Sequence, residues 1–417
     1  MKVAGVAVIA VVPRPGSPSV TAVMDDLLRL LPAYRPSMDR ISLAIHARPE
    51  VRFEERYAVS ELTRWLAGEG FAVGCPAGGL ETAFVARHQG SRPGPTVAVL
   101  MEYDALPGLG HGCGHNLIAA GGALAAILAA RAQPDHPGTL LAIGTPAEEG
   151  GGGKIHMLEA GVFDDVDAAL MFHPADRGLV ARHALAAAHL GLRFHGRAAH
   201  AAKNPQDGRS ALAAVQLFLT AVDMMRQFAP TTARLHGIIT NGGDAPNVVP
   251  ALTEAALFVR DTTAEGLADL IARITDAANG AALATGCKAD IFETAPQYAG
   301  RIHNLTLANR CAGYLGELGV DLEPPSPTNP AGSSDIGNLS QAIPVIHPYL
   351  QIAERDTPGH SEQMRDAAGG PEAHDRTALM AVAIARTALD ALGDTEFLTA
   401  ARGEFRDAVG EPARGYQ

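Results

Sequence analysis

Cysteines are few in this chain, and long basic or apolar runs are lacking. The four cysteines among its 417 residues (Cys75, Cys113, Cys287 and Cys311) include no CxxC pair. They cannot form a dense disulfide framework, and so few are compatible with a reducing compartment. No stretch contains the roughly 18 consecutive apolar residues that a bilayer-spanning helix needs. No run of Lys and Arg is present either, which argues against nucleic acid as a partner.

What the chain does contain is an ordinary globular composition. Apolar residues make up 47% and charged residues 19%. These values exclude disorder, collagen and coiled coil as the main architecture, and they leave ample material for a large core. The 33 basic and 45 acidic side chains give a net charge of −12. At about 150 residues per domain, the length predicts two or three domains.

The first residues resemble a short signal peptide. Lys2 precedes an apolar run at residues 3–12, as in the start of such a peptide. Pro13 and Pro15 follow at once, where a cleavage site would need small residues. We therefore expect a poorly ordered tail or an upstream-extended start, and a cytoplasmic protein.

The first part of the chain alternates strands and helices. Apolar stripes at helical spacing predict two helices within residues 19–70. Short buried-type strands are predicted at 96–101, 139–144 and 168–172, with an alanine-rich helix at 117–132. Alternation with short connections favours an α/β sheet covered on both faces.

The pattern changes near residue 183. Residues 186–195 alternate apolar and polar side chains, which is typical of an antiparallel strand with one wet face. A helix at 210–228, strands at 235–240 and 254–260, and a helix at 264–278 follow. The order strand-helix-strand-strand-helix-strand describes a small α+β module. Helix and strand then alternate again to the end. We therefore predict one α/β domain interrupted by an inserted α+β domain, with boundaries at 1–184, 185–297 and 298–417.

The three predicted strands of the first part all end in chemically active residues. The first ends at Glu102 and Asp104, the second at Glu148 and Glu149, and the third at His173. In open α/β sheets, ligands bind at the carboxyl ends of strands. Acidic and imidazole groups at three such ends are hard to explain by packing. A lone His173 would nevertheless be a buried core histidine more often than a ligand.

The glycine-rich turn after Asp104 carries Cys113 and His115 on either side of a glycine. A thiolate and an imidazole at this spacing are good ligands for a zinc-like ion. The alternative is a glycine-rich loop with an inert, half-buried cysteine, and the short Cys-Gly-His triplet does not decide between them.

Glu148 and Glu149 precede four glycines, and adjacent carboxylates repel unless a cation or proton holds them. One as metal ligand and one as general base is a natural division of roles. A solvated acidic turn is the more common fate of an isolated pair. The flanking glycines and the upstream buried strand favour function.

Three further candidates lie in the insert and one near the C-terminus. His200 and Asn247 lie in glycine-containing segments, and Arg260 ends a predicted strand. An arginine there can hold a substrate carboxylate through two hydrogen bonds, although a solvated arginine is the simpler interpretation. His360 lies in a segment that would otherwise be a surface turn.

Taken together, these segments resemble the aminoacylase/carboxypeptidase family of dinuclear metallohydrolases, metallopeptidase family twenty, and within it the amidohydrolase branch. No single motif decides this, but their shared order along nearly the whole chain after residue 40 is specific. The stretch 241–247 and Ile346–Tyr349 are most similar to β-alanyl-lysine dipeptidases and aminobenzoyl-glutamate hydrolases. The matching segments are residues 45–55, 103–107, 113–116, 146–151, 173, 196–202, 246–250, 332–335 and 360.

The resemblance implies a zinc-peptidase-like catalytic domain with a mixed, largely parallel sheet. It also implies that the insert is a ferredoxin-like α+β domain that acts as a lid and in dimerisation. Residue by residue, the resemblance implies that the metal ligands are Cys113, His115, Glu149, His173 and His360. It implies that Glu148 is the general base and that Asp104 orients the metal ligands. It further implies that His200 reaches the partner's site in family dimers and stabilises the oxyanion, and that Asn247 and Arg260 bind the substrate carboxylate.

The implied activity is hydrolysis of the amide bond in an N-acyl amino acid or a dipeptide with a free carboxylate. Glu148 would take a proton from water activated by two divalent ions and return it to the departing amine. Many members of the wider superfamily carry a metal-binding histidine where this chain has Glu102. The metal therefore stays open between Zn²⁺, which a thiolate favours, and Mn²⁺.

Three alternatives stay open from the sequence. Cys113 with His115 describes a thiol hydrolase, although the paired glutamates would then be unexplained. A non-catalytic metal- or peptide-binding homologue would not need Glu148. An aminopeptidase with the same metal centre would require a free substrate N-terminus.

Overall fold

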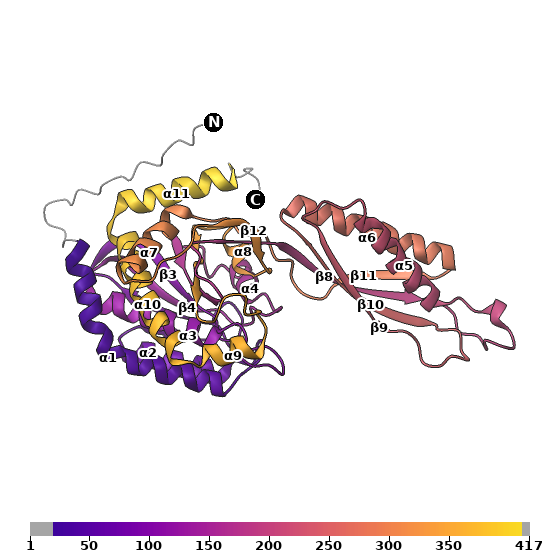
Figure 1. The fold of residues 1–417 in the computed structure, drawn as a ribbon, viewed down its shortest axis with the longest axis horizontal. Coiled ribbons are helices and arrows are strands. Elements are labelled where there is room, and N and C mark those ends of the chain that lie inside the picture. Colours follow the sequence, from indigo (N-terminus) through magenta and orange to yellow (C-terminus); the bar gives the residue numbers. More distant parts are fainter. Residues whose placement is uncertain (1–19, 411–417) are drawn as a thin grey trace.

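The computed structural model describes residues 20–410, with the side chains of 20–21 and 326–331 left aside. The apolar run at 3–12 lies outside them. The chain forms two lobes joined by a narrow connection (Figure 1). The first lobe is built on a six-stranded sheet of order β1-β2-β4-β3-β5-β13. Its strands are β1 (Ala72–Gly74), β2 (Phe84–Gln89), β3 (Arg92–Met101), β4 (Pro137–Gly144), β5 (Ala168–Leu170) and β13 (Val345–Ile346).

The sheet is mixed and largely parallel, as predicted. β3 runs parallel to β4 and β5, and β13 runs parallel to β5, while β2 pairs antiparallel with β1 and β4. β1 and β2 were not predicted. The parallel strands place their carboxyl ends on one edge, and this edge carries the predicted site.

Helices cover both faces of the sheet, so successive side chains along a buried strand point into two different cores. On β3, Val97 and Val99 pack on one face, with α1 (Val20–Ala47), α2 (Arg56–Gly68), α3 (His115–Ala132) and α10 (Pro371–Gly393). Ala98 and Leu100 pack on the other face, with α4 (Gly153–Glu159) and α8 (Ile336–Leu339). Among the described helices, α3 is long and apolar enough to cross a membrane, but 89% of it is buried inside the fold.

The second lobe is an antiparallel sheet of order β11-β8-β10-β9 backed by two helices. This is the ferredoxin-like arrangement. Along β8 the side chains of Leu190, Leu192 and Phe194 are buried and those of Arg193 and His195 are exposed, which confirms the predicted alternation. Its elements are β8 (Ala186–His195), α5 (Ala211–Arg226), β9 (Arg234–Asn241), β10 (Leu252–Asp261), α6 (Ala264–Thr285) and β11 (Lys288–Glu293).

Further strands and helices complete the two lobes. The third predicted strand is shorter than expected: β5 ends at Leu170, and His173 begins a separate strand, β6, that pairs parallel with β14. The remaining elements are β6 (His173–Ala175), β7 (Arg182–Ala184), a 3-10 helix η1 (Pro205–Asp207) in the second lobe, α7 (Leu305–Glu317), β12 (Ser326–Ala331), β14 (Tyr349–Gln351), α9 (Glu362–Ala368) and α11 (Thr395–Val409).

Candidate metal centre

The turn after β4 aims two glutamates at the sheet edge. Ala147 has a φ of 59°, in the left-handed region that side chains rarely adopt. Its backbone N–H donates to the Glu55 carboxylate at 2.9 Å, and the same oxygen accepts the N–H of Phe53, which also has positive φ. Glu55 is fully buried. It therefore holds the conformation that places Glu148 and Glu149, a role that the sequence did not reveal.

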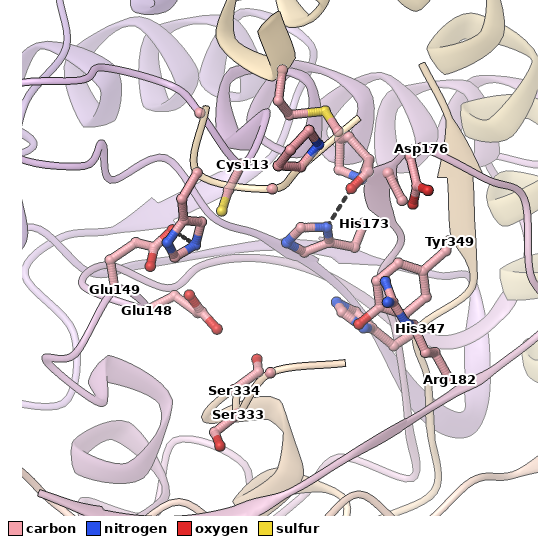
Figure 2. A pocket seen from close by; sticks show the side chains of 18 of the residues that line it. Cys113, Glu148, Glu149, His173, Asp176, Arg182, Ser333, Ser334, His347 and Tyr349 are labelled. Atoms are coloured by element: carbon pink, nitrogen blue, oxygen red, sulfur yellow. Dashed lines mark hydrogen bonds and ion pairs between the residues drawn. The ribbon is translucent and has the colours of Figure 1, made fainter. Parts of the chain in front are cut away.

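The structure brings the five predicted metal ligands together from distant parts of the chain. Within each of three sets, ligand atoms lie within 4.8 Å of one another. Cys113 and His115 each belong to two of these sets, so the five residues could hold more than one cation. Figure 2 shows Cys113, His173, Glu148 and Glu149 around one cavity. The sets are Cys113–His115–His173, Cys113–Glu149–His360 and His115–Glu148–Glu149.

Asp104 orients two of these ligands. Nδ1 of His115 lies 2.9 Å from the Asp104 carbonyl oxygen and 3.1 Å from Oδ1 of its side chain. The other carboxylate oxygen accepts the backbone N–H of Glu149 at 2.8 Å. His173 is held in the same way, since its Nδ1 donates to the carbonyl of Pro174 at 2.6 Å. Such contacts fix a ring so that Nε2 faces a metal.

The cluster has the electrostatics of a cation site. Burial, then Glu149, raises the pKa of Glu148 well above 4.5, and burial with Glu149 raises that of the Cys113 thiol well above 9. His115 Nε2 and Glu149 Oε1 are buried and lack any hydrogen-bond partner. Sulfur, nitrogen and carboxylate donors converging in this way fit divalent transition metals.

The same pKa shift argues against Cys113 as a nucleophile. A thiol nucleophile needs a lowered pKa and a basic partner. The raised pKa of the Cys113 thiol therefore does not favour the thiol-hydrolase alternative.

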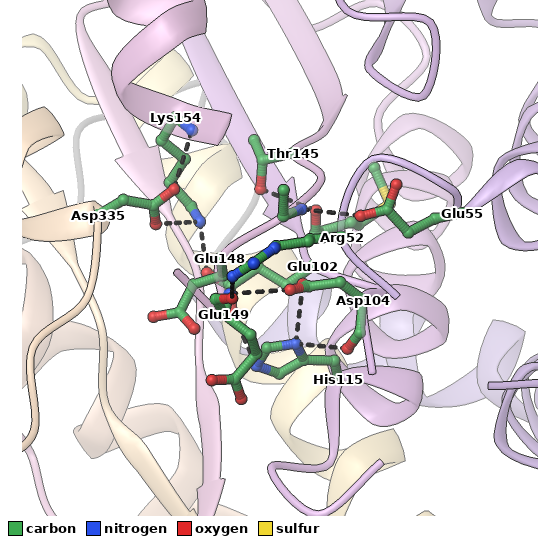
Figure 3. Close-up of polar contacts among 12 residues, drawn as sticks. Arg52, Glu55, Glu102, Asp104, His115, Thr145, Glu148, Glu149, Lys154 and Asp335 are labelled. Atoms are coloured by element: carbon green, nitrogen blue, oxygen red, sulfur yellow. Dashed lines mark hydrogen bonds and ion pairs between the residues drawn. The ribbon is translucent and has the colours of Figure 1, made fainter. Parts of the chain in front are cut away.

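Glu102, the departure from the wider superfamily, belongs to a fully buried ion triad (Figure 3). Lys154 Nζ bridges Glu102 and Asp335, the latter at 2.8 Å, and the Lys154 backbone N–H donates to Asp335 at 2.9 Å. Burial alone would lower the pKa of Lys154, but Asp335 and Glu102 raise it. Glu102, Glu148 and Asp335 also place carboxylate oxygens within 4.8 Å of one another. The lysine therefore offsets acidic charge directly behind Glu148.

A cavity of about 770 Å³ opens from the cluster, and both lobes line it. Arg260, Phe258 and His189 come from the second lobe. The Arg260 guanidinium lies 5.7 Å from the Phe258 ring centroid, and its Nε has no hydrogen-bond partner. This placement is the one that a substrate-binding role requires.

His200 and Asn247 lie outside this cavity within one chain. Both are exposed on the second lobe, where the N–H of Ala201 donates to the Asn247 carbonyl at 3.0 Å. The structure therefore brings these two residues together but separates them from the metal ligands. Their predicted roles depend on a second copy and stay predictions.

The fold and this cluster describe a metallopeptidase, and comparison with known proteins agrees. Residues 98–375 match the family described as peptidase family M20/M25/M40. A mouse Xaa-Arg dipeptidase is 39% identical over 95% of this chain and 96% of its own. A p-aminobenzoyl-glutamate hydrolase chain of Escherichia coli strain K12 is 39% identical over 69% of this chain and 64% of its own.

Solved structures share the fold. A Bacillus subtilis structure described as a dinuclear metal-binding peptidase of the M20 family has a TM-score of 0.66 and 20% identity, covering 86% of this chain and 99% of its own. The chain belongs to peptidase family M20. It is a hydrolase that acts on amide bonds, and this excludes the non-catalytic alternative.

Proposed function

We propose that the protein is a metal-dependent dipeptidase or N-acyl-amino-acid amidohydrolase that requires a free carboxylate on its substrate. The observation that carries the proposal is the position of Glu148. Glu148 is 7% exposed, it lines the cavity, and its carboxylate lies within 4.8 Å of ligand atoms of His115 and Glu149. A general base in this position can reach a water and the scissile amide together.

Two divalent ions would supply polarisation of the carbonyl and a water of lowered pKa. Cys113, His115, Glu149, His173 and His360 would hold them. Glu148 accepts the proton of the attacking water and delivers it to the departing nitrogen. Tyr298 positions this residue, because its hydroxyl donates to the Glu148 carbonyl at 2.9 Å. Within a dimer, His200 of a second copy stabilises the oxyanion.

The donor set supports Zn²⁺ or Mn²⁺ as the ion. A thiolate with imidazoles favours zinc, and the carboxylate-rich surroundings suit manganese. His173 presents only Nε2 to the cluster, since Nδ1 is engaged, and this is the usual histidine ligand atom for both ions.

Arg260 supports the requirement for a carboxylate. A half-buried guanidinium with an unpartnered Nε can form two parallel hydrogen bonds with such a group. The names of the relatives agree in part: one is a dipeptidase and the other acts on an amide of glutamate. An aminopeptidase would instead need a free substrate amine, so N-blocked substrates separate the two functions.

We further propose a cytoplasmic homodimer formed through the second lobe. β9 is an edge strand of its sheet, and Ile238 on it is 64% exposed. Phe228 and Leu283 of the same lobe are 75% and 84% exposed. A strand edge that exposes an apolar side chain such as Ile238 is a surface that natural proteins usually cover. A second copy would cover it and supply His200 and Asn247 to the first copy's cavity.

A hydrolysis screen tests the proposed function. Purified protein loaded with Zn²⁺ or Mn²⁺ is assayed on N-acetyl amino acids, on dipeptides and on the matching C-terminal amides. We expect turnover of N-blocked acids, loss with chelator, recovery with metal, and no turnover of the amides. Cleavage restricted to substrates with a free N-terminus would establish the aminopeptidase instead. Turnover that a chelator leaves unchanged and that thiol alkylation abolishes would reject a metal mechanism.

A further inference from the structure

Besides Arg260, the wall of the cavity contains Arg301, a buried arginine without an ion pair among the described residues. Arg301 is only 8% exposed, and it lines the cavity. Its Nη1 donates to the Tyr349 hydroxyl at 3.1 Å and to the Arg182 carbonyl at 3.3 Å. Its Nε and Nη2 have no partner, and no ion pair of Arg301 occurs in residues 20–410. A buried, unpaired charge is costly, so the site is incomplete without an anion.

The two unpartnered nitrogens of Arg301 have a specific geometry. In a planar guanidinium, Nε and Nη2 present their N–H groups along one edge, and that edge matches the two oxygens of a carboxylate. Nη1, on the other edge, is already used by the protein. The fold therefore orients Arg301 so that the edge that can bind a carboxylate has no hydrogen-bond partner in the protein.

His347 adds two more polar atoms without a hydrogen-bond partner to this wall of the cavity. It is 4% exposed, lines the same cavity, and neither ring nitrogen has a hydrogen-bond partner. In either protonation state the imidazole can donate at least one hydrogen bond to an anion. Its ring centroid lies 5.4 Å from that of His173, and Tyr349 lies equally close to His173. The unpartnered atoms of Arg301 and His347 thus lie next to the metal-ligand cluster.

The acidic residues near this wall are already paired. Asp176 and Asp356 line the cavity, but both contact Arg177, at 3.2 and 2.6 Å. Arg260 has a different neighbour, because its guanidinium lies 5.7 Å from the ring centroid of Phe258 in the second lobe. Figure 2 shows His347, Arg182 and Tyr349 together, with His173 between them and the two glutamates. Arg301 and Arg260 are therefore separate cationic groups in one cavity.

We infer that Arg301 and His347 form an anion subsite that binds a second carboxylate of the substrate, in addition to the one assigned to Arg260. This inference rests on the proposed function, and it narrows the substrate class to dicarboxylic amides. The second carboxylate belongs either to the departing amino acid, as in an N-acyl glutamate, or to the acyl group, as in an N-succinyl amino acid. Both present the same chemistry to the guanidinium edge.

Matched substrate pairs test the subsite and identify its source. The first pair is N-acetylglutamate and N-acetylglutamine, and the second is N-succinylalanine and its terminal amide, N-succinamoylalanine. We expect the metal-loaded protein to prefer the dianionic member of one pair. Arg301→Gln should raise KM at least tenfold for that member and less than twofold for its monoanionic amide. The control Arg260→Gln should raise KM for both members alike.

An equal rise in KM for both members of each pair in Arg301→Gln would overturn the inference. Arg301 would then bind the carboxylate that both members share, or it would only support the fold. Arg301→Lys provides a second test where the glutamine variant does not fold. It keeps the charge but lacks the two-nitrogen edge, so the KM for the dianionic member should rise several-fold. An unchanged KM in this variant also contradicts the subsite.

A binding measurement separates failure of the subsite from failure of the function. Calorimetric titration of the metal-loaded protein with glutamate and with succinate should show heat that Arg301→Gln removes, whereas glutamine should give weak heat in both proteins. Such binding without hydrolysis of any pair would keep the subsite and reject the proposed function. Equal binding of either dianion to both proteins would reject the subsite, whatever the turnover.

Discussion

Nδ1 of His115 lies 3.1 Å from Oδ1 of Asp104, while Oδ2 of the same carboxylate accepts the backbone N–H of Glu149 at 2.8 Å. One buried side chain thus ties the turn after β4 to the start of α3. Both groups that it holds are predicted metal ligands. The geometry of the centre therefore depends on a residue that need not touch a metal.

Asp104→Asn should weaken metal binding more than it weakens the fold. The amide keeps one acceptor but removes the charge that orients His115. Loss of such an outer partner typically lowers metal affinity by about 10–100-fold. Competition titration with a chromophoric chelator measures this loss, with thermal melting of the metal-free protein as the control. Unchanged affinity would show that Asp104 does not orient the site.

Lys154→Met should destabilise the fold strongly. It leaves Glu102 and Asp335 buried without their shared cation, and breaking a buried pair from one side costs about 3–5 kcal/mol. Urea unfolding measures the free energy of unfolding. Lys203→Met, at an exposed lysine, serves as the matched control and should change it by less than about 0.5 kcal/mol.

A partial recovery identifies the cause of the Lys154 effect. Adding Glu102→Gln to Lys154→Met removes one of the two stranded charges, so the double variant should be more stable than Lys154→Met alone. Additive losses from the two substitutions would mean that the triad is not a coupled unit.

Gly153→Ala should reduce both stability and turnover. A Cβ at this position would lie 1.8 Å from the Pro146 carbonyl oxygen, so the turn that carries Glu148 and Glu149 must move. Forcing atoms into a packed site costs about 1–3 kcal/mol. Gly280, inside α6, has nothing within 4 Å of its Cβ position, and Gly280→Ala should stabilise by about 0.5–1 kcal/mol with unchanged kcat. Full activity in Gly153→Ala would contradict a rigid turn.

The free energy of unfolding should depend on pH through His303. Burial, then Arg301, lowers the pKa of His303 from 6.5 to about 4. Between these values the unfolded chain binds the proton and the folded chain does not, so stability falls as the pH drops from 6.5 to 4. The loss from this one group is about 3 kcal/mol when complete. Urea unfolding at pH 7, 5.5 and 4 should show a shallower loss in His303→Gln, and an identical slope would refute the assignment.

Strand ends were the most predictable part of the site. The apolar runs of β3 and β4 are buried on both faces, so they are clear in the sequence, and Asp104 and Glu149 follow directly from them. β2 was missed because its residues 84–89 mix apolar and charged side chains. β5 proved shorter than its apolar run because the chain leaves the central sheet after Leu170 and His173 joins β14 instead.

Buried charges were the least predictable part. Glu55, Lys154 and Arg301 look like ordinary surface residues in the sequence. Their importance comes from burial and from partners far along the chain, such as Asp335 for Lys154. The only local sign for Lys154 was its place directly after four glycines. His200 and Asn247 are the opposite case. Sequence motifs identified them, but within one chain they lie outside the cavity that the metal ligands line.

The central claim is that distant segments of the chain build a two-cation centre with Glu148 beside it as the base. Metal content by mass spectrometry, measured on Glu148→Gln together with its turnover, tests this claim most directly. We predict two divalent ions per chain in both the parent protein and the variant, with turnover abolished in the variant. Loss of the ions from Glu148→Gln, or turnover that survives the substitution, would contradict it.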